Sequence, residues 1–193
     1  MIIDAKSLRT GTELQKIPDI SGWYKWWAKE DTARKLLGYF FDELLPVLTK
    51  GTGELNEYYY LYVGIDNSMR KRLDWHINQQ HTAGYIKTGF LSTFRNSIAS
   101  LIANDLFAET ETNNIIDTFK VEYFPMDIPK KEIEATIEIP QMGSNVLPIN
   151  IQNNHNPRIQ EFTHYLKEQR ANSRQKALLW IPNSSNKYQK IRL

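Results

Sequence analysis

The pattern of hydrophobic and polar positions along this chain predicts short strands rich in aromatic residues, separated by amphipathic helices. Three stretches suit a pleated, half-buried surface: residues 21–27, 58–63 and 117–124. In the first of them, alternation puts Tyr24 and Trp26 on one face and Trp23, Lys25 and Trp27 on the other. We therefore expect a small, mainly antiparallel sheet of three strands.

Apolar residues at helical spacing predict the helices around that sheet. The expected segments are residues 33–45 after a cap at Asp31 or Thr32, 69–77 after Asn67 or Ser68, 93–102 after Ser92, an acidic helix at 130–139 that Pro140 closes or kinks, and a last helix starting at Asn156-Pro157. Residues 178–181 have the pattern of a short strand. The alternation of strands and helices favours an α/β (α+β) domain with helices packed on the sheet.

One of these helices brings unusual chemistry to the end of a strand. Arg72 and His76 stand four residues apart, so both side chains project from one face, toward the end of the strand that carries Tyr62. Two of these residues have an ordinary explanation when taken alone: Tyr62 as a sheet tyrosine with a satisfied hydroxyl, and His76 as a helix-surface or capping histidine. Their convergence at one strand-to-helix corner is what favours a functional site.

Composition narrows the class of protein. The chain has 193 residues, 41% hydrophobic and 24% charged, which fits one globular domain with a real core. No run is apolar enough to span a bilayer and residues 1–10 lack a signal-peptide core, so we expect a soluble, cytoplasmic protein without a membrane partner. The absence of cysteine excludes disulfides and thiolate metal sites. The net charge of +2 leaves nucleic acid open as a partner, because binding needs only a local basic face.

In chain order, the motifs resemble those of the GIY-YIG nuclease superfamily over about residues 18–157. The matching pieces are Gly22-Trp23-Tyr24, then Tyr62-Val63-Gly64, then Arg72-Leu73-Asp74-Trp75-His76, then a glutamate helix, then Asn150. The Arg72 segment is similar to the Arg-Leu-x-x-His of many members, while tryptophan and valine stand where the two strand motifs usually have isoleucine. The stretch between the two tyrosines is long, and larger members, including restriction endonucleases, carry insertions there.

The resemblance implies a catalytic set. Arg72 would clamp a phosphate, and Tyr24, helped by Tyr62 or His76, would relay a proton from the attacking water. Asn150 would orient the glutamate or a loop near it. The glutamate would hold one Mg²⁺ or Mn²⁺ ion per active site.

Two glutamates compete for that role as metal ligand. Glu138 stands twelve residues before Asn150, the commonest family spacing, whereas Glu134 sits better inside the predicted helix. They are four residues apart, so both can face the site. Standing alone, they would be a solvated acidic face. We favour Glu138.

The resemblance also implies DNA as substrate and a type II restriction enzyme as the favoured role. The alternatives are a binding module with weak or no catalysis, and a repair or mobile-element nuclease. The candidate contacts to nucleic acid are Lys25, Arg70, Lys71 and Arg95, although a solvated surface arginine is the ordinary explanation of the last. Cutting both strands with one site per chain would need a homodimer or two successive nicks.

The expected domain organisation has two parts. Residues 1–157 form the nuclease domain with a helical insertion at about 30–46, and residues 158–193 form a basic helical extension packed on it. Lys187, Lys190 and Arg192 make the end of that extension basic.

Overall fold

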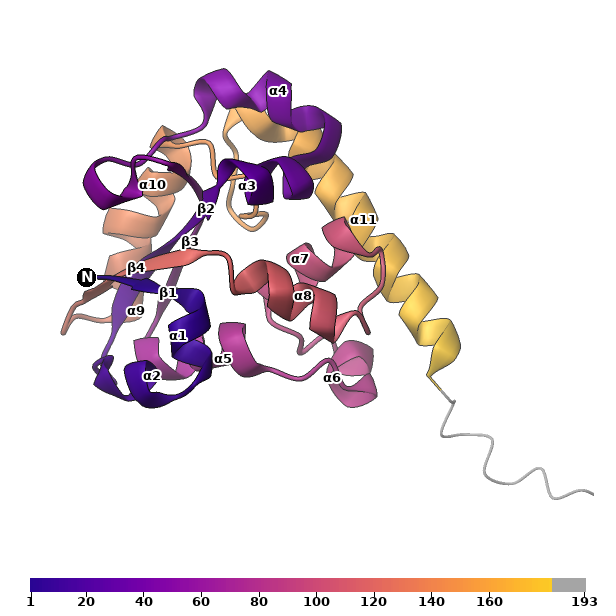
Figure 1. The fold of residues 1–193 in the computed structure, drawn as a ribbon, viewed down its shortest axis with the longest axis horizontal. Helices are drawn as coiled ribbons and strands as arrows, with labels where there is room; N and C mark the ends of the chain where they lie inside the picture. The colour runs from indigo at the N-terminus through magenta and orange to yellow at the C-terminus, as the bar shows by residue number, and fades with distance from the viewer. Residues whose placement is uncertain (182–193) are drawn as a thin grey trace, which may run out of the picture.

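A computed structural model describes residues 1–181, and its centre is an antiparallel sheet of four strands with helices on both faces (Figure 1). The strands are β1 (Ile2–Asp4), β2 (Gly22–Lys29), β3 (Tyr58–Asp66) and β4 (Lys120–Pro125). Their order in the sheet is β1-β4-β2-β3. The α+β class is confirmed, but the sheet has one strand more than expected. The strand that the sequence pattern did not predict is β1, which has three residues, too few to show alternation, and pairs with β4.

The helices occupy the stretches between and after these strands. Before β3 they are α1 (Ala5–Arg9), α2 (Thr12–Lys16), α3 (Glu30–Leu37), η1 (Gly38–Phe40), α4 (Phe41–Leu44), η2 (Leu45–Val47) and η3 (Gly53–Leu55). Between β3 and β4 they are α5 (Met69–Asn78), α6 (Ala83–Thr88), α7 (Thr93–Ile102) and α8 (Glu109–Ile116). After β4 they are α9 (Lys130–Ile133), η4 (Glu134–Glu138), α10 (Ile139–Ser144), η5 (Pro157–Ile159) and α11 (Gln160–Trp180). Of these, α1, α2, η3, α6 and α8 were not predicted.

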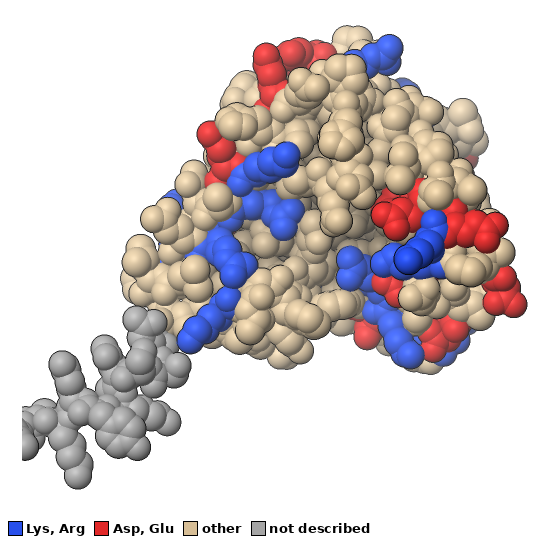
Figure 2. Space-filling model, turned by 180° about the vertical axis from the view of Figure 1, so that it is seen from behind, with Lys and Arg blue, Asp and Glu red and all other residues tan. Residues whose placement is uncertain are grey.

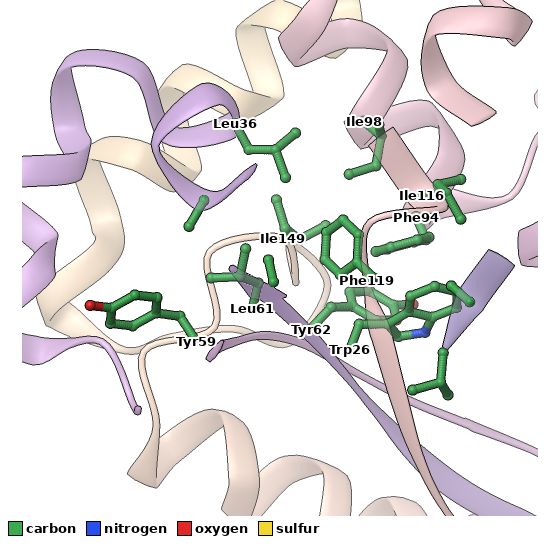
Figure 3. Close-up of a cluster of buried hydrophobic side chains, with 14 of the residues drawn as sticks. Trp26, Leu36, Tyr59, Leu61, Tyr62, Phe94, Ile98, Ile116, Phe119 and Ile149 are labelled. Atoms are coloured by element: carbon green, nitrogen blue, oxygen red, sulfur yellow. The ribbon is translucent and has the colours of Figure 1, made fainter. Parts of the chain in front are cut away.

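The two faces of β2 belong to different hydrophobic clusters, as the alternation predicts. Tyr24 and Trp26 enter the larger core, where Trp26 packs on Phe94 of α7 with 4.3 Å between ring centroids. Figure 3 shows Trp26, Tyr62, Phe94 and Phe119 meeting in this core. On the opposite face, Trp27 belongs to a smaller cluster under α10. Tyr24 therefore points toward the side of the sheet that α5 and α7 cover.

The helices that border the site begin where the sequence predicts. Ser68 caps α5 by accepting a hydrogen bond from the amide of Lys71, and Ser92 caps α7 by accepting one from Arg95. Burial of Met69, Leu73 and Ile77 confirms the predicted apolar stripe of α5.

Three other helix predictions need correction. The helix expected at residues 33–45 is broken at Gly38, whose φ of 56° lies outside the helical region. Pro140 does not end the helix, because it lies inside a continuous helical run from α9 to α10. The π-helical turn η4 comes directly before it, and the wider hydrogen-bond spacing of that turn accommodates the N–H that proline lacks. The strand expected at residues 178–181 is not formed: residues 178–180 are the end of α11, and the sheet in residues 1–181 has no strand there.

The C-terminal extension is helical as far as the structure describes it. Asn156 accepts a hydrogen bond from the amide of Arg158, Pro157 opens a 3₁₀ turn, and α11 follows and packs along α7. No helix in residues 1–181 combines the length and the apolar character needed to cross a membrane. Lys187, Lys190 and Arg192 lie outside the described residues.

Candidate active site

A pocket of about 290 Å³ opens beside α5, where β2 begins and the antiparallel β3 ends. Its walls come from β2, β3, α5, the start of α7, the α9–η4 run and the loop after Leu147, and they carry Tyr24, Tyr62, Gly64, Ile65, Arg72, Thr93, Lys130, Glu134, Glu138, Asn150, Ile151, Gln152 and Asn153. The structure thus brings six of the seven predicted catalytic residues to one cavity. The seventh, His76, lies behind Tyr24.

The two motif glycines are there because side chains would not fit. Gly64 stands opposite Tyr24 in the sheet, and a Cβ at Gly64 would lie 2.4 Å from both Cζ and Oη of that tyrosine. A Cβ at Gly22 would lie 2.4 Å from the sulfur of Met69 and 2.5 Å from the carbonyl oxygen of Phe124. The ring of Tyr24 therefore passes directly over Gly64, and α5 packs directly over Gly22.

Behind the pocket, Tyr24 begins a buried chain of hydrogen bonds. Its Oη is 2.8 Å from Nε2 of His76, and Nδ1 of the same imidazole is 2.6 Å from Oγ of Ser92. Burial raises the pKa of Tyr24 well above its ordinary value, and the neighbouring Tyr62 adds to the effect. Burial also lowers the pKa of His76 well below its ordinary value, helped by Arg72 and Arg95. At neutral pH the phenol is protonated and the imidazole is neutral.

Ser92 was predicted only as a helix cap, and its contact with His76 is an additional feature of the site. Its backbone N–H donates to Oε1 of Gln79 at 2.6 Å, which fixes the serine at the end of α5. With hydrogen on Nδ1, the imidazole donates to Ser92 and leaves Nε2 free to accept from Tyr24. The sequence signal was no more than a serine before a helix.

Arg72 places a guanidinium at the mouth of the pocket. The side chain of Arg72 is 22% exposed, and its Nε lies 4.0 Å from Oδ2 of Asp66. The guanidinium carbon Cζ lies 5.2 Å from the ring centroid of Trp75. Nε is buried and finds no hydrogen-bond partner within residues 1–181. Burial raises the pKa of Tyr62 to about 12, while the charge of Arg72 acts in the opposite direction. A permanent cation with an unused buried donor is suited to an anionic ligand.

Two carboxyl groups face the pocket from the π-helical turn η4. Glu134 and Glu138 are its first and last residues, and both line the cavity. Burial raises the pKa of Glu138 to about 7, repulsion from Glu134 adds to this, and Lys130 and Arg72 oppose it. π-helical turns occur often at functional sites. Here the turn holds two carboxyl groups that repel one another when both are ionised.

The carboxyl groups of Glu134 and Glu138 fit a hard divalent cation that is held by few protein ligands. Within residues 1–181 there is no group of three or more His, Asp or Glu side chains that could enclose an ion. Mg²⁺ is commonly bound through one or two carboxylates, with water and substrate phosphate completing its shell. Glu138 and Glu134 would supply those carboxylates, and a cation beside them would oppose the burial and the repulsion that raise the pKa of Glu138.

Asn150 closes the edge of the sheet beside Tyr62. β3 is the edge strand, and the amide of Asn150 pairs with both free backbone groups of Val63, accepting from its N–H and donating to its carbonyl, each at 2.8 Å. The same loop adds a bond from the amide of Ile149 to the carbonyl of Leu61. Asn150 thereby anchors the loop that forms one wall of the pocket, and its hydrogen bonds in the structure go to Val63 rather than to a glutamate.

The residues expected to contact nucleic acid are scattered. Lys25 lies on the face of β2 opposite Tyr24, 3.3 Å from Glu122 and against the ring of Trp23. Arg70 donates to the carbonyl of Ile17. Lys71 is exposed on the outer side of α5.

The prediction that Arg95 is a surface contact is wrong. Its side chain is fully buried, and it donates to the carbonyls of His76 and Ile77, to Nε2 of His81 and to Oδ1 of Asn113. The first two acceptors are carbonyls of the last turn of α5, which has no further helix to bond to them. Arg95 therefore fixes the end of α5 that carries His76.

Hydrolysis of a phosphodiester needs a group that binds phosphoryl oxygens, a group that handles a proton, and a place for charge neutralisation. Three elements supply them: α5 carries Arg72 and His76, β2 carries Tyr24, which contacts His76, and η4 carries the two carboxyl groups. This combination defines the class as a nuclease.

Comparison with family models agrees with this class. A model described as the GIY-YIG catalytic domain matches residues 22–172, which is most of the chain. The chain therefore belongs to the GIY-YIG family and is an endonuclease, a phosphodiester hydrolase. Searches among curated proteins and among solved structures found no match.

Proposed function

We propose that this chain hydrolyses DNA with the help of one Mg²⁺ or Mn²⁺ ion per active site, and that its biological role is that of a type II restriction enzyme. The observation that supports the hydrolytic part is the single pocket shared by Tyr24, Tyr62, Arg72, Glu138 and Asn150. The restriction role rests on the additional structure around that pocket, described below.

In the proposed reaction, Arg72 binds the scissile phosphate. The guanidinium is charged at every physiological pH, and Nε has no competing hydrogen bond in residues 1–181. Arg72 lies beside both phenols in the pocket, so a phosphate bound to its guanidinium would lie close to Tyr24 and Tyr62. Replacing it by lysine keeps a positive charge but removes the planar fork that can bond two oxygens at once.

Tyr24 and His76 handle the proton of the attacking water. A phenol whose pKa is raised far above neutrality is a poor base by itself. It becomes a relay when it donates its proton to Nε2 of the neutral imidazole, 2.8 Å away, as it accepts one from water. Oγ of Ser92 would accept a hydrogen bond from Nδ1–H, which favours the tautomer of His76 that this transfer needs.

Glu138 is the residue we assign to the metal, with Glu134 beside it as the alternative ligand. A divalent ion held by these carboxylates would supply positive charge against the negative charge that builds up during hydrolysis. Asn150 keeps the facing loop in place through its two hydrogen bonds to Val63, so the pocket retains its shape when substrate enters.

DNA and the restriction role are supported by the surface and by the size of the chain. Figure 2 shows Lys and Arg side chains gathered in two groups on one face, with a hollowed strip between them; Asp and Glu side chains are interspersed in the right-hand group. Two segments outside the catalytic motifs, the run from α3 to η2 and helix α11, add surface that a sequence-reading enzyme can use to contact base edges. We further propose that the segment from residue 158 onward extends the nuclease domain of residues 1–157; α11 packs along α7, and its first part, up to residue 172, lies within the family match.

Cleavage of supercoiled plasmid and of genomic DNA, with Mg²⁺ or with EDTA, tests the proposal. The variants are Arg72→Ala, Glu138→Gln and Glu134→Gln, and the matched control is Glu132→Gln, an exposed glutamate of α9 that does not line the pocket. We expect cleavage that needs Mg²⁺, is lost with Arg72→Ala and Glu138→Gln, and is retained with Glu132→Gln.

The outcomes separate the rival functions. Discrete bands from genomic DNA support a restriction enzyme, whereas a smear supports a repair or mobile-element nuclease that takes its specificity from another protein. Full activity of Glu138→Gln with loss in Glu134→Gln moves the metal ligand to Glu134. DNA binding without cleavage on any substrate refutes the catalytic proposal and leaves a binding module.

A further inference from the structure

A second pocket opens on the outer side of α5, the helix that carries Arg72 and His76. It has a volume of about 370 Å³ and is lined by Lys71, Asp74, Trp75, Asn78, Gln79, Gln80 and Tyr85. Six of these residues come from α5 or directly follow it, and Tyr85 comes from α6. Its walls combine aromatic rings with amide and charged side chains, and none of them is aliphatic.

Three aromatic rings form a row beside this pocket. Trp75 and Phe90 have ring centroids 5.1 Å apart, and Phe90 and Tyr85 stack with centroids 6.2 Å apart. Phe90 is 58% exposed and Tyr85 is 42% exposed, so the outer part of the row faces solvent. Clustered aromatic rings on a surface, unlike a single one, indicate an interaction site.

The row continues directly from the catalytic pocket. Arg72 lines that pocket, and its guanidinium carbon is 5.2 Å from the ring centroid of Trp75. On the other side, the short segment 90–93 begins with Phe90 in the row and ends with Thr93 in the wall of the catalytic pocket. A nucleotide strand whose phosphate lies at Arg72 therefore has the aromatic row within reach of its neighbouring bases.

Hydrogen bonds hold the segment that carries Phe90 in position beside α5. Gln79 is buried, donates to the carbonyl of Phe90 at 2.9 Å and accepts from the amide of Ser92 at 2.6 Å. These bonds fix the segment that carries Phe90 relative to α5. The exposed side chains of Asn78 and Gln80 remain at the rim, where amides can bond to the edges of bases.

We propose that Trp75, Tyr85 and Phe90 form a stacking platform for one or two unpaired nucleobases next to the scissile phosphate. This inference rests on the proposed function, since it takes DNA as the ligand. Nucleobases fit the site because they are flat, stack on aromatic rings and carry polar edges, whereas an aliphatic peptide would find no aliphatic side chain in the lining. The platform favours DNA that is single-stranded or opened beside the cut.

Binding measurements in EDTA test the platform independently of cleavage. Fluorescence anisotropy with an end-labelled 20-nucleotide single strand, and with the duplex of the same sequence, gives a Kd for each variant. Stacking is worth about 1–3 kcal/mol per base, so we expect Phe90→Ala and Tyr85→Ala to weaken single-strand binding by roughly 5- to 150-fold. Duplex binding should change less, and Phe90→Tyr should bind the single strand as the unaltered protein does.

Phe107→Ala is the matched control, because Phe107 is an aromatic residue of similar type, 38% exposed, that lines a different pocket. Circular dichroism and thermal unfolding check that each variant is folded. Unchanged single-strand binding in folded Phe90→Ala and Tyr85→Ala, or an equal loss in Phe107→Ala, overturns the platform.

The failure of the platform can be told from failure of the proposed function. If the unaltered protein cleaves plasmid with Mg²⁺ but the ring variants bind normally, only the platform is wrong. If no DNA is bound by the unaltered protein in EDTA and none is cleaved with Mg²⁺, both are wrong.

Discussion

Replacing Gly64 by alanine tests whether the close passage of Tyr24 over the sheet is what places the phenol. The new Cβ would lie 2.4 Å from Cζ and Oη of Tyr24 and 2.6 Å from Cε2. Ordinary contacts begin near 3.4 Å, so the ring must move by about 1 Å. Tyr24 is fully buried and its Oη is 2.8 Å from Nε2 of His76, so a shift of that size breaks the hydrogen bond.

The expected cost follows from these two effects. Overpacking a core costs about 1–3 kcal/mol, and leaving a buried hydrogen-bonding group unpaired costs about 1–3 kcal/mol more, so Gly64→Ala should lose about 2–6 kcal/mol of unfolding free energy. A catalytic group displaced by about 1 Å lowers the rate by roughly 100-fold. Urea denaturation measures the first quantity, and plasmid cleavage under native conditions measures the second.

Gly143→Ala provides the matched control. Gly143 lies in α10 and its added Cβ would meet nothing within 4 Å. Alanine there should stabilise the helix by about 0.5–1 kcal/mol and leave cleavage unchanged. The reasoning is refuted if Gly64→Ala unfolds at the same urea concentration as the unaltered protein, or if it is destabilised yet cleaves DNA at the full rate.

Three further predictions concern the residues around the pocket. Ser92→Ala should lower the cleavage rate by about tenfold or more and alter its pH profile, because His76 loses the partner that sets its tautomer. Ser92→Thr should retain most of the activity. Equal pH profiles for the two variants would contradict this role of Ser92. The pKa of Glu138 is about 7 in the folded protein and lower in the unfolded chain, so the folded protein loses stability as pH rises from about 4.5 to 7. In EDTA, the Tm of Glu138→Gln should therefore fall less between pH 5 and pH 8 than the Tm of the unaltered protein. Parallel Tm curves would show that Glu138 is not responsible. Arg95→Met should cost about 3 kcal/mol or more in urea unfolding, because the carbonyl of His76, Nε2 of His81 and Oδ1 of Asn113 lose their donor, while the carbonyl of Ile77 keeps the bond from Arg9. A loss under about 1 kcal/mol would show that these bonds contribute little.

The amino-acid sequence by itself determined the local parts of the site. Alternating aromatic residues placed Tyr24 and Trp26 on one face of β2, and the i, i+4 spacing placed Arg72 and His76 on one face of α5. Ser92 was recognisable as a cap for α7. These features depend on the geometry of a single strand, helix or turn, so neighbouring residues carry enough information to predict them.

Tertiary structure decided everything that depends on partners distant in the chain. β1 is a strand only because β4 lies beside it, and Arg95 is buried because the end of α5 and Asn113 offer it acceptors. The contact between Ser92 and His76 likewise joins two helices.

The same holds for the chemistry of the pocket. The pKa of Glu138 is raised to about 7 by burial and by Glu134, and the π-helical turn that holds both carboxyl groups forms where the α9–α10 run packs against β3. Burial, charge and hydrogen-bond partners act through space, across tens of residues of chain. A one-dimensional pattern can therefore name the catalytic candidates, whereas the folded protein determines their protonation and their hydrogen-bond partners.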